Sequence, residues 1–131
     1  MHHGSCLCQG VTFTVSGELP PIQVCYCSEC RRAQGGPVAT NLPVAEAQVT
    51  WLTGLELMQS FESSPGKLRC FCKVCGSPLF SQRSSLPGVL RLRAGLLAEP
   101  VKAAVGFHFY HDSKASWWPG PIDAPIYPAG Q

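Results

Sequence analysis

The residues of this chain that are best suited to chemistry are eight cysteines, which fall into three groups. The groups are Cys6 and Cys8; Cys25, Cys27 and Cys30; and Cys70, Cys72 and Cys75. Because the N-terminal segment has no apolar run typical of a signal peptide, we expect a cytoplasmic protein. Disulfides are rare in a reducing cytosol, so the cysteines favour metal binding over a disulfide framework.

The spacing within two of the groups predicts a closed metal site. In an extended strand, residues two apart point to the same face, so Cys6 and Cys8 are expected to direct two sulfurs to one ion. A C-x-x-C segment across a tight turn supplies two more, and Gly76 permits a positive φ in such a turn. Zinc binds four soft ligands in a tetrahedron. Spacing alone does not say which groups meet in space.

The trio Cys25, Cys27 and Cys30 predicts a different kind of site. Three protein ligands with one open position are the arrangement of a catalytic zinc. The trio carries three negative charges against the two positive charges of zinc. Arg31 and Arg32 follow directly, and they would either offset this excess or bind an anionic substrate through bidentate contacts.

Four alternatives bear on these assignments. A disulfide framework would need an oxidising compartment, and a single zinc site would leave incidental cysteines. Cys70 would either complete the tetrahedron of the trio or remain a buried spare thiol, and we favour the spare thiol. His108 or His111 could approach the metal, although a surface histidine is the commoner case.

The elements that must position these cysteines are predicted to be short strands. The chain contains 13 Gly and 12 Pro in 131 residues and only 14% charged residues, a composition that favours turns over long helices. Strands are expected at 11–15, 22–25, 37–42, 49–52, 57–61, 67–71, 78–81, 89–95 and 104–110. The segments 57–61 and 67–71 read as a hairpin, and 28–33 and 45–47 as single helical turns. The sequence therefore predicts a mainly β fold.

Charge excludes some partner classes. The net charge of +2 is too small for a dedicated nucleic-acid binder, which usually shows a basic stripe. No segment reaches the roughly 18 apolar residues of a membrane-spanning helix. Arg91 and Arg93 alternate on one strand face and are expected to face solvent.

The cysteine groups and their flanking residues resemble a known family. The matching segments are Gly4-Ser5-Cys6-x-Cys8-x-Gly10, Cys25-x-Cys27-Ser28-x-Cys30-Arg31-Arg32 and Arg69-x-Phe71-Cys72-x-x-Cys75-Gly76-Ser77-x-Leu79. They resemble the glutathione-dependent formaldehyde-activating enzyme family, which also includes centromere protein V. The resemblance implies a β-tent fold of small antiparallel sheets stapled by zinc. It implies one zinc domain over residues 1–131. The prolines of the last segment independently predict that 118–131 wraps the domain without regular structure.

The resemblance also implies ligand sets and an activity. Cys6, Cys8, Cys72 and Cys75 would hold a structural zinc, and Cys25, Cys27 and Cys30 a second, catalytic zinc. From their position beside the trio, Arg31 and Arg32 are our candidates for binding the carboxylates of a thiol substrate such as glutathione; the alternative is that they are solvated or balance the charge of the zinc site. The implied reaction is that of a carbon–sulfur lyase, which joins formaldehyde and glutathione into S-(hydroxymethyl)glutathione. A zinc-stapled, non-catalytic protein-interaction module of the same fold is the alternative.

Overall fold

The computed structural model describes residues 1–118 and 124–129, and these residues are mainly β-strand. The strands are β1 (His2–Ser5), β2 (Thr12–Val15), β3 (Ile22–Cys25), β4 (Ala39–Ala45), β5 (Val49–Thr53), β6 (Met58–Ser64), β7 (Lys67–Cys72), β8 (Pro78–Arg83), β9 (Val89–Arg93) and β10 (Val105–Phe109). One α-helix, α1 (Ser28–Gln34), and short 3-10 turns at Glu46–Gln48, Leu55–Leu57, Ala94–Leu96 and His111–Ser113 complete the described elements.

Nine of these strands lie where the sequence predicts them. The hairpin of β6 and β7 and the helical turn at α1 form as expected. The sequence reasoning missed β1, and it ended β4 too early, because β4 continues through Pro43 to Ala45. The prediction of a mainly β fold is confirmed.

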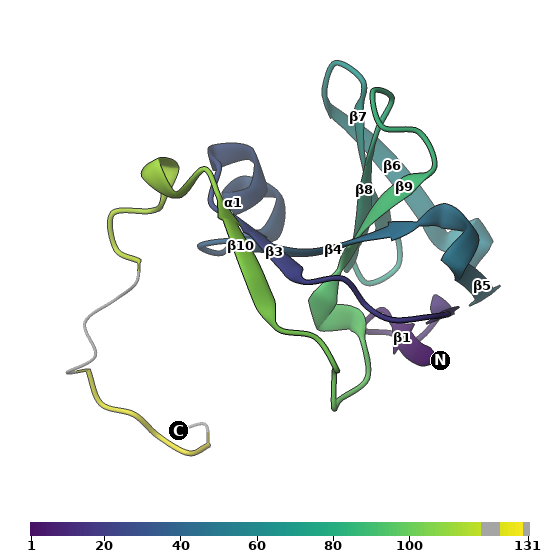
Figure 1. Cartoon of the computed structure of the whole chain (residues 1–131), viewed down its shortest axis with the longest axis horizontal. Coiled ribbons are helices and arrows are strands. Elements are labelled where there is room, and N and C mark those ends of the chain that lie inside the picture. Colours follow the sequence, from purple (N-terminus) through teal and green to yellow (C-terminus); the bar gives the residue numbers. More distant parts are fainter. Residues whose placement is uncertain (119–123, 130–131) are drawn as a thin grey trace.

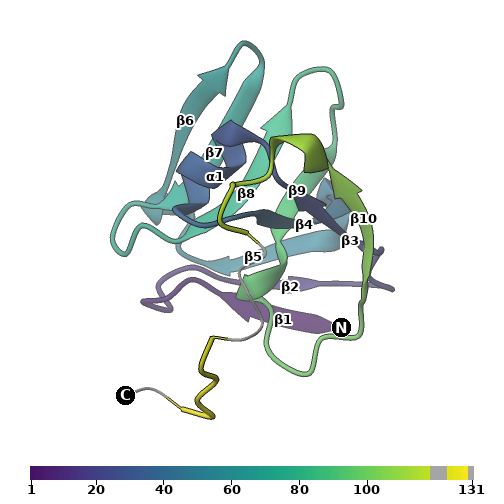
Figure 2. The same ribbon diagram turned by 90° about the vertical axis from the view of Figure 1, so that its left-hand side faces the viewer.

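The strands form two sheets, arranged as Figures 1 and 2 show. The small sheet has the order β1-β2-β5, and the large sheet has the order β10-β3-β4-β9-β8-β7-β6. The strand pairs are antiparallel except for β3 and β10, which run parallel. The small sheet lies below the large one in Figure 2.

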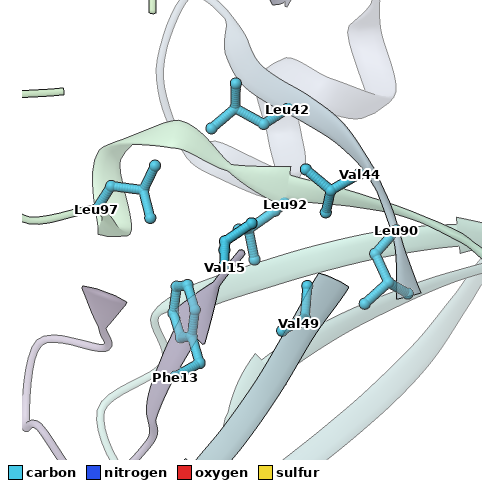
Figure 3. Close-up of a cluster of buried hydrophobic side chains, with 8 residues drawn as sticks. All are labelled: Phe13, Val15, Leu42, Val44, Val49, Leu90, Leu92 and Leu97. Atoms are coloured by element: carbon cyan, nitrogen blue, oxygen red, sulfur yellow. The ribbon is translucent and has the colours of Figure 1, made fainter. Parts of the chain in front are cut away.

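An apolar core lies between the sheets. Phe13 and Val15 of β2 and Val49 of β5 pack against side chains of the large sheet, as Figure 3 shows. The large sheet contributes Leu42 and Val44 from β4 and Leu90 and Leu92 from β9, and Leu97 closes one end. Because successive strand residues face opposite sides, this apolar face leaves the other face of the large sheet free for polar residues.

The opposite face of the large sheet gathers cations, which we call the cationic face: Lys67, Arg69, Arg83, Arg91 and Arg93. Strand register places them together, since Lys67 pairs with Arg83, and Ser81 pairs with both Arg69 and Arg91. Residues directly opposite in a ladder share a face. The cationic face therefore holds five of the ten Lys and Arg residues of the chain.

Helix α1 connects β3 to β4 and contacts β4. Its N-cap is Cys27, whose sulfur accepts a hydrogen bond from the Cys30 N–H at 3.3 Å. It ends at Gly35, whose φ of 69° is in the left-handed region that glycine adopts without strain. The cap thus fixes two cysteines of the trio relative to each other.

The C-terminal wrap predicted for 118–131 falls partly outside the described residues, at 119–123 and 130–131. Residues 124–129 are exposed and lie in neither helix nor strand. No helix within residues 1–118 and 124–129 is long and apolar enough to cross a membrane.

Candidate metal centres and the adjoining cavity

The sulfurs of Cys6, Cys8, Cys72 and Cys75 form the first cluster, with every sulfur within 4.8 Å of the others. The Cys6 and Cys8 sulfurs are 3.5 Å apart, and those of Cys8 and Cys72 are 3.9 Å apart. A tetrahedral zinc with Zn–S bonds near 2.3 Å requires sulfurs about 3.8 Å apart, whereas a disulfide brings them to about 2.05 Å. The spacing thus fits four ligands of one ion, and all eight cysteines are free thiols.

Two similar turns present these sulfurs. In one the Cys6 N–H bonds the carbonyl of Val11 at 3.0 Å, and in the other the Cys72 N–H bonds the carbonyl of Ser77 at 3.0 Å. Each turn contains one residue of positive φ, Gln9 at 63° and Gly76 at 78°. The expectation for Gly76 is confirmed. The expectation of an extended strand at Cys6 and Cys8 is wrong, because β1 ends at Ser5 and both cysteines lie in the turn that follows.

Backbone N–H groups point at the sulfurs of this first cluster. Val11 N–H donates to the Cys6 sulfur at 3.3 Å, and Gly10 N–H donates to the Cys8 sulfur at 3.4 Å. The hydroxyl and the backbone N–H of Ser77 lower the pKa of Cys75 to about 5. Such donors favour thiolate, the form that binds a metal. Cys6 and Cys72 are buried, Cys75 is half-buried and Cys8 is exposed, so this cluster is buried on one side and reaches the surface at Cys8.

The second cluster joins Cys25, Cys27 and Cys30, whose sulfurs also lie within 4.8 Å of one another. Cys25 is the last residue of β3, Cys27 caps α1, and Cys30 lies in the first turn of that helix. A strand end and a helix start therefore converge on one point. Cys30 is buried, whereas Cys25 and Cys27 are half-buried.

One thiolate of the trio is strongly favoured. The Cys25 thiol, and then Cys27 and Arg69, lower the pKa of Cys30 to about 4 against the opposing effect of burial. The Arg69 Nη2 group donates to the Cys30 sulfur at 3.8 Å. The pKa of Cys25 is raised, first by its hydrogen bond to Cys30 and then by burial. The trio thus holds negative charge at its buried end, beside a buried guanidinium.

Cys70 and the two histidines lie outside both clusters. Cys70 is 4% exposed and packs in an apolar cluster with Val11 and Leu79. Burial raises its pKa, so its thiol is neutral near pH 7. The buried thiol favoured from the sequence agrees with this placement. His108 and His111 are exposed, and His108 Nδ1 shares a hydrogen bond with the Tyr26 hydroxyl at 2.9 Å.

A cavity of about 380 Å³ borders all three cysteines of the trio. Its other walls include three members of the cationic face, Lys67, Arg83 and Arg91, against one carboxylate, Glu29. The exposed Phe109 and Tyr110 form part of its rim. Lys67 is 8% exposed, and its pKa is lowered by burial and then by Arg69. Burial and then Arg83 lower the pKa of Arg91. A cavity with clustered cations favours an anionic ligand.

The predicted substrate residues Arg31 and Arg32 are not among the residues that line this cavity. Both lie in the last turn of α1, where Arg31 is half-buried and Arg32 is exposed. The expectation that Arg91 and Arg93 face solvent is wrong, since Arg91 lines the cavity and Arg93 is 5% exposed.

Arg91 and Arg93 belong to β9, which lies between β4 and β8 inside the large sheet. One sequence signal could have indicated that these arginines are not solvent-facing: they alternate with Leu90 and Leu92 in a strand whose leucines need a buried environment.

Comparison with known proteins assigns the chain to a family. The model of the glutathione-dependent formaldehyde-activating enzyme family matches residues 1–113. The chain belongs to this family. A Halomonas elongata protein that carries the provisional name of a glutathione-dependent formaldehyde-activating enzyme is 39% identical over 85 residues. That match covers 59% of this chain and 53% of the relative, so the chain spans about half of the relative's length.

A solved structure has a similar fold. The crystal structure of a Rhodobacter sphaeroides protein superposes with a TM-score of 0.64 at 23% identity, and the match covers 80% of this chain and 98% of that one. The segment that matches the formaldehyde-activating enzyme family contains both cysteine clusters and every residue of the cationic face. The sequence resemblance to the family is thereby confirmed.

Proposed function

We propose that this chain is a zinc-dependent enzyme that joins a thiol, such as glutathione, to a small aldehyde, such as formaldehyde. In this proposal Cys6, Cys8, Cys72 and Cys75 hold a structural zinc, and the trio holds a second zinc for catalysis. The proposal includes a single zinc domain over residues 1–131 and a cytoplasmic location. The observation that carries it is the cation-lined cavity beside a cluster of only three sulfurs.

The donor chemistry of both clusters suits zinc. Thiolate is a soft ligand, and sets of four or three sulfurs within 4.8 Å of one another match its preferred coordination. Cys30, with a pKa of about 4, is ready to bind as thiolate. A zinc ion bound to the trio would supply a positive charge that favours the thiolate form of the substrate near neutral pH.

The charges of the cavity suit the rest of the substrate. Glutathione carries two carboxylates, and Lys67, Arg83 and Arg91 are the cations that the cavity offers them. Lys67 is buried and the two arginines are half-buried. Cations withdrawn from water are costly without an anionic partner, so a bound carboxylate would offset their desolvation. Arg31 and Arg32 remain a prediction for the same role, which separate variants can test.

The proposed reaction balances as an addition. The thiol loses its proton, its sulfur forms a bond to the aldehyde carbon, and the C=O π pair moves to the oxygen, which takes up a proton. The reverse reaction is carbon–sulfur lysis. Phe109 and Tyr110 at the rim would limit water around the bound substrates. Holding both reactants against the trio would accelerate the addition by orientation.

The test is a rate measurement on zinc-loaded protein. Exchange NMR with ¹³C-formaldehyde and glutathione measures adduct formation above the uncatalysed rate. We expect acceleration by the wild type and by Cys70→Ala, which removes a thiol outside both clusters, and at least a hundredfold loss in Cys27→Ser. Equal rates with and without the wild-type protein would contradict the proposal and favour the protein-interaction module.

A further inference from the structure

A second cavity, of about 330 Å³, lies where the C-terminal end of α1 faces the sheet. Phe61 and Phe71 give it apolar walls, while Gln34, Arg69 and Arg93 give it polar ones. None of its lining residues lines the cavity beside the trio. It is therefore a separate space on the same cationic face.

The polar walls of this second cavity carry unused donors. Gln34 Nε2, Arg69 Nη1 and Arg93 Nε are buried and have no hydrogen-bond partner among the described residues. Arg69 is 8% exposed and Arg93 is 5% exposed. A buried donor without a partner destabilises the folded protein, and more so when it is charged. Three such donors around one cavity indicate an acceptor that the protein does not supply itself.

Both guanidinium groups are held in place by their other contacts. Arg69 Nε donates to the Ser63 hydroxyl at 3.0 Å, and Arg69 Nη2 donates to the Cys30 sulfur at 3.8 Å. Arg93 Nη1 donates to the amide oxygen of Asn41. Their free N–H groups are thus fixed before any ligand arrives, which lowers the entropic cost of binding.

We propose that this second cavity binds a small organic carboxylate with an apolar body, of which benzoate is a simple example. The two oxygens accept hydrogen bonds from the free N–H groups of Arg69, Arg93 and Gln34, since guanidinium and carboxylate form strong charge-assisted bonds. The apolar body packs against Phe61 and Phe71. Inorganic anions fit less well, because they would leave these apolar walls in contact with water.

The experiment is a titration of zinc-loaded protein with benzoate, followed by ¹H–¹⁵N NMR and calorimetry. We expect saturable shifts of the Arg69 and Arg93 Nε–H signals and at least tenfold weaker binding of benzamide, the neutral analogue. Gln34→Glu should weaken benzoate binding at least tenfold. Thr50→Glu, which adds the same charge at an exposed position of β5 in the small sheet, should leave it unchanged.

Several results would overturn the proposal: no saturable binding, equal binding by Gln34→Glu and wild type, or displacement of benzoate by an equal concentration of chloride or phosphate. Displacement by S-methylglutathione would instead assign the cavity to the substrate of the trio. If Gln34→Glu does not fold, Ala33→Phe replaces it, since Ala33 is exposed on α1 and lines the same cavity. Binding is read without turnover, so the result is independent of the proposed enzyme activity.

Discussion

The two cysteine clusters are built from different structural elements. Two tight turns, far apart in sequence, supply the four sulfurs of the first cluster, and backbone N–H groups surround them. One continuous segment, from the end of β3 into α1, supplies the three sulfurs of the second cluster. Only the second cluster borders the cavity lined by Lys67, Arg83 and Arg91. A long-range cluster is suited to bracing the fold, and a local one can change its occupancy without unfolding the chain.

The largest expected effect follows from removing one sulfur of the first cluster. Cys72→Ser should unfold the protein, because a structural zinc contributes an apparent free energy of about 10–16 kcal/mol and a domain is stable by only about 5–15 kcal/mol. Circular dichroism and the thermal midpoint measure this loss. A Cys72→Ser protein with wild-type stability would show that the first cluster does not brace the fold.

Cys27→Ser tests the second cluster by contrast. Serine is a good N-cap, so this variant should keep α1 capped while it removes one sulfur from the trio. We expect a native circular dichroism spectrum, about one zinc per chain and no turnover. Cys27→Ala should lose the cap as well and be less stable than Cys27→Ser by about 1 kcal/mol. If Cys27→Ser and Cys72→Ser unfold alike, the clusters do not differ in role.

Removal of metal at rising chelator concentration should empty the two clusters one after the other. The wild type should contain about two zinc ions per chain. A weak chelator should remove the ion of the trio first, since three protein sulfurs beside a cavity would hold it, whereas four sulfurs would hold the ion of the first cluster. Mass spectrometry under native conditions counts the ions, and circular dichroism follows the fold. Loss of both ions in a single step would contradict the comparison.

The smallest effect concerns the substrate contacts near the trio. Arg91→Met should raise KM for glutathione about tenfold, because one charge-assisted contact of about 1.4 kcal/mol is lost. Arg32→Met, an exposed arginine of α1 that does not line the cavity, should change KM less than twofold. Steady-state kinetics at fixed formaldehyde measures both. A larger rise in KM for Arg32→Met than for Arg91→Met would instead support the sequence prediction that Arg31 and Arg32 bind the substrate.

Much of the fold could be predicted from local patterns. Alternation of apolar and polar residues located β2 and β9, and short runs between turn residues located the other strands from β3 to β10. The turn residues Ser63-Ser64-Pro65-Gly66 located the hairpin of β6 and β7. These signals depend on neighbours in the sequence, as do the spacings of the three cysteine groups. The cysteine spacing was therefore sufficient to predict two candidate metal sites.

The cavity could not be predicted in the same way. The cationic face exists because the register of two ladders, β7 with β8 and β8 with β9, sets Lys67 opposite Arg83 and both Arg69 and Arg91 opposite Ser81. No local pattern carries this register. Reasoning from the nearest charges in sequence led to Arg31 and Arg32, which lie on the helix instead of on the walls of the cavity. The turn at Cys6 and Cys8 was missed because positive φ at Gln9, a residue other than glycine, has no clear sequence signal.

The long sequence separation within the first cluster has a consequence for folding during synthesis. Cys8 lies 64 positions before Cys72, and their sulfurs meet at 3.9 Å. On the ribosome, the N-terminal turn therefore has to wait, with its thiols exposed, until the turn after β7 has emerged. The short segment of the trio can capture an ion earlier, so the local centre is expected to fill before the long-range one during synthesis.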